Sequence, residues 1–77
     1  MRKDKIVKAI NDFIEAIEIS FNSFDLDRIK KIQKRAADGE FATASDLITE
    51  LSRVKALDNK LGRDALRHLE KEIKSFF

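Results

Sequence analysis

Five cationic side chains occur close together near the middle of the sequence, and they are the residues best suited to binding. Lys30 and Lys34, and likewise Lys31 and Arg35, are four residues apart, a spacing that places each pair on one side of a helix. The members of this basic ridge are Arg28, Lys30, Lys31, Lys34 and Arg35. Such a ridge could bind phosphates or an acidic protein, and the alternative is a solvated helix surface. We expect no exposed aromatic side chain beside it for base stacking.

A second pattern lies in residues 39–48, where a helix stop is followed by a helix start. The matching positions are Gly39, Phe41, Ala44, Ser45, Asp46 and Ile48. This pattern resembles the inter-helix turn and second-helix start of ribbon-helix-helix antitoxins of the ParD type, and the resemblance extends from about Ile17 to Val54. It implies that a β-strand at 17–21 pairs two chains on DNA and that the C-terminal segment binds a toxin. The residues entering the major groove would be Glu18, Ser20 and Asn22. A glycine helix stop followed by a capping sequence is the alternative explanation.

A third pattern comprises Arg63, Asp64 and His68. It resembles the arginine, polar residue and histidine signature of HEPN-type ribonucleases, in which a helix presents both basic side chains at a dimer interface. The resemblance implies RNA cleavage by Arg63 and His68. The alternative is that His68 lies at the core boundary and contacts Asp64 or Glu72.

The remaining residues offer little for catalysis. With one histidine, no cysteine and no glycine-rich phosphate loop, most metal, nucleophile and nucleotide sites have too few parts. Carboxylates such as Glu15 and Glu18 share a polar helix face, where they are expected to be solvated. We therefore expect a protein that is not an enzyme and that holds no metal and no cofactor.

Apolar residues recur every three or four positions along most of the chain, which predicts amphipathic helices that position these patterns. The clearest helix runs from about Lys3 to Phe21. A second runs from about Asp25 to Asp38, where Gly39 can end it in the left-handed conformation. The apolar stripe of the first is Ile6, Val7, Ile10, Phe13, Ile14, Ile17 and Phe21, and that of the second is Leu26, Ile29, Ile32 and Ala36.

Two further helices are expected in the second half of the chain. Thr43 or Ser45 caps the third, and Phe41 packs before it as a hydrophobic staple. The third stripe is Ala44, Leu47, Ile48, Leu51, Val54 and Leu57, and the fourth is Leu61, Ala65, Leu66, Leu69, Ile73 and Phe76. Residues 58–62 favour a break between them, although the apolar spacing continues through this segment.

The predicted fold class is all-α, a small antiparallel bundle of four helices. Without a break at 58–62, three helices with a long C-terminal helix would leave one face uncovered and favour dimerisation. A ribbon-helix-helix dimer with an N-terminal helix is the other alternative. The phenylalanines assigned to the core are Phe13, Phe21, Phe24, Phe41 and the terminal pair Phe76 and Phe77, one of which is in register with the fourth stripe. The alternative for the terminal pair is an exposed docking element.

Composition limits the size and setting of the protein. Its 77 residues fit a single helical domain, 1–77, because so short a chain buries only one modest core. Hydrophobic residues make up 43% and charged residues 39%, so the chain can both fold and stay soluble. The absence of cysteine is compatible with a reducing compartment, and we expect a cytoplasmic location. No apolar run is long enough to span a membrane.

We therefore expect a small non-enzymatic protein-interaction module, with a regulatory, inhibitory or adaptor role. In this hypothesis the basic ridge binds a larger protein, which the net charge of +2 leaves open alongside a nucleic-acid partner. The alternatives are a DNA-binding repressor of the ribbon-helix-helix antitoxin type and, more remotely, a HEPN-like ribonuclease. The protein is expected to be a monomer or a homodimer.

Overall fold

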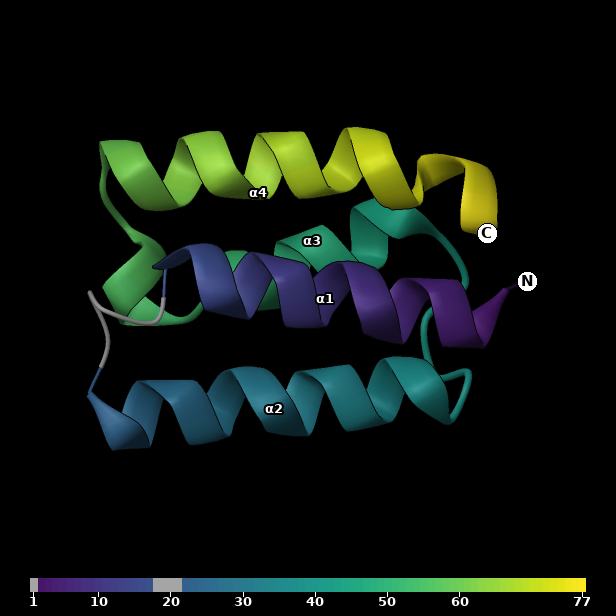
Figure 1. The fold of residues 1–77 in the computed structure, drawn as a ribbon, viewed down its shortest axis with the longest axis horizontal. Coiled ribbons are helices and arrows are strands. Elements are labelled where there is room, and N and C mark those ends of the chain that lie inside the picture. Colours follow the sequence, from purple (N-terminus) through teal and green to yellow (C-terminus); the bar gives the residue numbers. More distant parts are fainter. Residues whose placement is uncertain (1, 18–21) are drawn as a thin grey trace.

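The computed structural model describes residues 2–17 and 22–77, and every regular element in this part of the chain is a helix. The elements are α1 (Lys3–Ile17), α2 (Ser23–Ala37), α3 (Ala44–Ser52), η2 (Lys55–Leu57), α4 (Lys60–Ile73) and η3 (Lys74–Phe76). In Figure 1, α1 lies between α2 and α4, and the shorter α3 lies behind it and closes the other side of the core. The predicted four-helix bundle is confirmed.

Side-chain caps define where three of the helices begin. The amide of Asp25 donates to Asn22 Oδ1 at 2.9 Å, which starts α2 slightly earlier than the predicted Asp25. Of the two predicted caps for α3, Thr43 is the one used, since its Oγ1 accepts the amide of Asp46 at 3.1 Å. Gly39 has a φ of 79°, and its amide donates to Ala36 O at 3.0 Å, so the predicted left-handed stop after α2 is confirmed.

The chain turns between α3 and α4, so the alternative of one long C-terminal helix is wrong. The break between the two helices comprises residues 53–59, so it begins earlier in the chain than the predicted break at residues 58–62. The amides of Arg53 and Val54 donate to carbonyls of the last turn of α3, at 3.2 and 3.0 Å, and this closes that helix. Asn59 Oδ1 then accepts the amide of Gly62 at 2.8 Å and starts α4. Val54 is fully buried although it lies outside α3, which explains why the apolar spacing continues through the turn.

Within the described residues, the core is built from aliphatic side chains of all four helices together with Phe13 and Phe41. Its largest fully buried side chains are Ile6, Ile10, Ile29, Leu47, Leu51, Leu57, Leu69, Ile73 and Val54. Phe13 and Phe41 are buried, and Phe76 and Phe77 pack partly buried against the core. Most of the predicted stripes therefore face inward, as four-helix packing requires.

Two apolar side chains assigned to stripes or to the core are exposed instead. Phe24 is 70% exposed and Leu61 is 57% exposed. Each lies in the first turn of its helix and points to the flank of the buried stripe, where no neighbouring helix covers it. The prediction that these two residues are buried is wrong.

The predicted strand at 17–21 overlaps the end of α1. Ile17 is helical and buried in the core, contrary to that prediction. Residues 18–21 lie outside the described part of the chain. The last turn of the predicted first helix and the predicted core position of Phe21 fall on these residues.

Candidate functional site

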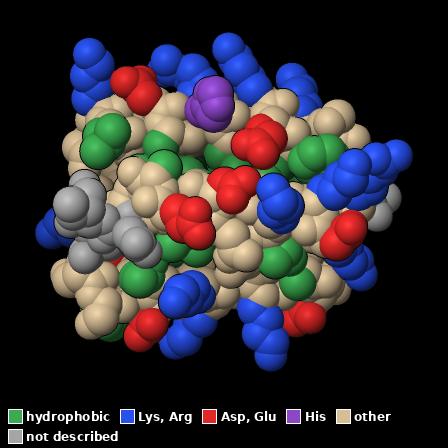
Figure 2. Space-filling model, viewed as in Figure 1, with side chains coloured by type: hydrophobic (Ala, Val, Ile, Leu, Met, Phe, Trp, Pro, Cys, Tyr) green, Lys and Arg blue, Asp and Glu red, His purple; other side chains and the backbone are tan. Residues whose placement is uncertain are grey.

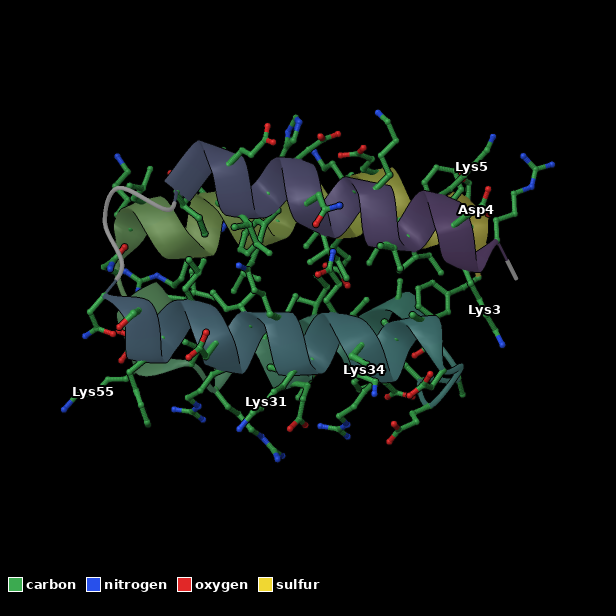
Figure 3. All side chains as sticks on the ribbon, turned by 60° about the horizontal axis from the view of Figure 1, so that its bottom comes forward. Lys3, Asp4, Lys5, Lys31, Lys34 and Lys55 are labelled. Atoms are coloured by element: carbon green, nitrogen blue, oxygen red, sulfur yellow. The ribbon has the colours of Figure 1, made fainter. Side chains whose placement is uncertain are left out.

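The basic ridge lies on the outer surface of α2. Ile29, Ile32 and Ala36 hold this helix against the core, and the lysines between them, Lys30, Lys31 and Lys34, are exposed to solvent. In Figure 3, Lys31 and Lys34 point away from the bundle on the side opposite α1. All five predicted ridge residues are on α2, but they do not form one uniform group.

Arg35 belongs to the fold rather than to a free surface. Its Nε donates to Glu40 Oε1 and its Nη1 donates to Glu50 Oε1, both at 3.3 Å, and its guanidinium lies 5.0 Å from the ring centroid of Phe41. The hydrogen bond that Arg35 donates to Glu40, and then the one that it donates to Glu50, raises the pKa of Arg35, so it stays cationic. Arg53 adds a further contact to Glu50 at 3.6 Å. This cluster ties α2 to the following loop and to α3.

The other four ridge residues are available to a partner. Arg28, Lys30, Lys31 and Lys34 are exposed, and they form no ion pair with any carboxylate within residues 2–17 and 22–77. They border a shallow groove of about 760 Å³. The other residues of this groove are Phe24, Asp27, Ile32, Arg35 and Glu50.

Phe24 is the functional candidate that sequence reasoning missed. It precedes Arg28 by four residues and Lys31 by seven, so it shares their side of α2. The prediction of no exposed aromatic beside the ridge is therefore wrong. The sequence did contain a signal for this exposure. Phe24 lies two residues before Leu26, where the apolar stripe of α2 begins, and a two-residue step places it outside that stripe.

A second hollow, with a volume of about 280 Å³, lies between α1 and α4. Its lining consists of Ala9, Asp12, Phe13, Ala16, Ala65, His68, Leu69 and Glu72. We call it the α1/α4 groove. Figure 2 shows hydrophobic and carboxylate side chains together near the centre of this face, with the histidine above them and most Lys and Arg toward the edges. The groove thus differs from the ridge in the sign of its charge.

The three residues that resemble the ribonuclease signature do not act as one group. Arg63 Nη1 contacts Asp58 Oδ1 at 3.4 Å, and Asp64 Oδ1 contacts Arg67 Nη1 at 3.7 Å. His68 lines the α1/α4 groove together with Glu72, and it also borders a smaller hollow with Asp64. His68 is exposed, which differs from the predicted position at the core boundary.

No protein-family model, curated protein or solved structure matches this chain. In the part of the chain that the structure describes, no three His, Asp or Glu side chains are grouped as a metal site, and no helix is long and apolar enough to cross a membrane. The class defined by fold and surface is therefore a small four-helix bundle with a basic helix face and an acidic apolar groove.

Proposed function

We propose that this protein is a non-enzymatic, cytoplasmic interaction module that binds a larger protein through α2, in a regulatory, inhibitory or adaptor role. The observation that carries the proposal is the exposed Phe24 beside cations that form no ion pair within the described residues. Partner-binding surfaces commonly combine an aromatic anchor with surrounding charge. In this arrangement Phe24 supplies affinity, and the cations of α2 mainly accelerate association.

The shape and charge of this surface favour an acidic protein over a nucleic acid. Arg28 to Lys34 span only about 9 Å of helix, enough for one or two phosphates. The net charge of +2 also gives little long-range attraction to nucleic acid. A DNA-binding dimer of the ribbon-helix-helix type would require Ile17 in a strand, whereas it ends α1.

The test is affinity co-purification from an extract of the source cells, with the retained proteins quantified by mass spectrometry. The variant R28E/K31E/K34E and the variant Phe24→Ser should each lose the partner that the unaltered protein retains. Circular dichroism would first establish that both variants keep their helical content.

The matched control is K60E/K71E, which reverses two exposed cations on the outer side of α4. This control should keep the partner, because it leaves α2 unchanged. Retention of the same partner by R28E/K31E/K34E would contradict the proposal. Salt-sensitive binding to a generic DNA duplex that is lost in that variant would assign the ridge to nucleic acid instead.

A further inference from the structure

The α1/α4 groove has the features of a receiving surface for a basic helix. Phe13 and Leu69 form its buried base, and the small side chains of Ala16 and Ala65 leave space at one end. Carboxylates border it from both helices, Asp12 from α1 and Glu72 from α4. Asp12 Oδ2 lies 3.7 Å from Lys8 Nζ in an exposed ion pair within α1, which an incoming cation would replace. An aromatic or aliphatic side chain flanked by cations would complement this combination of a small apolar hollow and two acids.

Another part of the same chain has this pattern, namely the exposed side of α2. Phe24, Arg28 and Lys31 follow one another at spacings of four and three residues on a single helix flank. Phe24 and Leu61 are the two large hydrophobic side chains exposed within the described residues. Leu61 precedes Ala65 by four residues, so helical spacing places it at the apolar end of the groove.

The spacings of the two surfaces also agree along their length. Ala65 and Glu72 are seven residues apart on α4, and Phe24 and Lys31 are seven residues apart on α2, about 10.5 Å in each case. Because α1 runs antiparallel to α4, with the amide of Arg2 donating to Phe76 O at 2.8 Å, Asp12 faces the middle of this interval. If Phe24 of one surface were placed over Ala65 of the other, Lys31 would therefore lie at the level of Glu72.

We propose that α2 of one copy docks into the α1/α4 groove of a second copy of this chain. Phe24 enters the hollow beside Ala16 and Ala65, Arg28 approaches Asp12, and Lys31 approaches Glu72. The ridge and the groove lie on different sides of the bundle, so a chain cannot make this contact with itself (Figure 1).

This contact joins two different surfaces, so it is heterologous and leaves an unused ridge and groove at its ends. The inference goes beyond the proposed function and rests on it only in taking α2 to be a binding surface. Where both interactions occur, self-association covers α2 and competes with the larger partner. Weak association would then act as a concentration-dependent block on partner binding.

The experiment is sedimentation velocity of the full chain from micromolar to millimolar concentration, at low and at high salt. For the unaltered protein, the average mass at high concentration and low salt should rise at least about twofold above the 8.9 kDa of one chain, without levelling off at a dimer, because each assembly keeps an unused ridge and groove. High salt should reduce that rise, because the charges in the contact are exposed to screening. The groove variant D12K/E72K and the ridge variant R28E/K31E should each stay monomeric.

A chain that carries all four reversals exchanges the charges of both surfaces, so it should self-associate again. The control K60E/K71E has the same net charge as R28E/K31E and should associate like the unaltered protein. A chain that stays monomeric at millimolar concentration and low salt would overturn the inference. Association that survives either reversal, or that the four reversals together fail to restore, would overturn it as well.

The groove variant also separates this inference from the proposed function. D12K/E72K keeps α2 intact, so it should still capture the larger partner after self-association is lost. If that variant binds the partner and the unaltered protein never self-associates, only the inference fails. If self-association follows the charge pattern but no partner depends on α2, only the proposed function fails.

Discussion

Substituting Gly62 by alanine should destabilise this protein, although the same change stabilises most helices. Gly62 is in the first turn of α4 and is buried. A Cβ atom at this position would overlap Leu57 O and would lie 2.6 Å from Leu57 Cα and 2.7 Å from Leu57 C. These are backbone atoms of η2, so they cannot move aside as a flexible side chain can. The turn between α3 and α4 therefore requires a residue without a side chain at position 62.

The size of the effect follows from two opposing contributions. Replacing glycine by alanine within a helix usually stabilises by about 0.5–1 kcal/mol. Forcing an extra methyl group into a packed site costs about 1–3 kcal/mol, and contact with backbone atoms favours the upper part of that range. The net loss for Gly62→Ala is about 1–2 kcal/mol, which corresponds to a fall in Tm of about 5–15 °C for a domain of this size.

Thermal and urea denaturation followed by circular dichroism would measure this loss. Lys71→Ala, at an exposed site on the same helix, should change the free energy of unfolding by less than about 0.5 kcal/mol. An unchanged or higher midpoint for Gly62→Ala would refute the reasoning, because it would mean that η2 moves away from α4 at little cost.

The remaining predictions concern the other turn, a helix cap and the exposed aromatic. Gly39→Ala should lower the free energy of unfolding by about 1–2 kcal/mol because its φ is 79°, and Gly39→Asn should lose less, both measured by urea denaturation. Asn59→Ala should cost about 1 kcal/mol in the same assay, whereas Asn59→Asp should restore the cap. Phe24→Ser should leave the free energy of unfolding within about 0.5 kcal/mol of the unaltered protein, while Leu51→Ala in the core should cost about 2–5 kcal/mol. Equal losses at Phe24 and Leu51 would contradict the assignment of Phe24 to the surface.

Much of the fold could be predicted because the buried faces follow helical spacing and the turns use residues with defined local roles. Gly39 and Thr43 act within a few residues of their own positions, so their roles are visible in the sequence. Leu61 and Phe24 are different. Whether an apolar residue in a first turn is covered depends on where the neighbouring helix lies, and local spacing does not contain that information.

The candidate site was predictable only in part for the same reason. The cations of α2 could be placed on one helix from their spacing. Arg35 differs from the other four ridge residues because it pairs with Glu40 in the loop and Glu50 on α3. Tertiary packing brings these two carboxylates to α2. The α1/α4 groove likewise joins residues more than fifty positions apart in the chain, such as Asp12 and Glu72. No periodicity within one helix could have indicated it.

The chemistry of the ridge residues matches the two roles that the structure separates. A guanidinium presents several donors in a fixed plane, so Arg35 can hold Glu40 and Glu50 together while its face packs on Phe41. A lysine ammonium is a strongly hydrated charge on a flexible stem, and fixing it in an exposed ion pair gains little. Lys31 and Lys34 are therefore better suited to attracting an acidic surface than to stabilising this bundle. Because the fold already has its link between α2 and α3 through Arg35, these lysines can change without loss of the structure that presents Phe24.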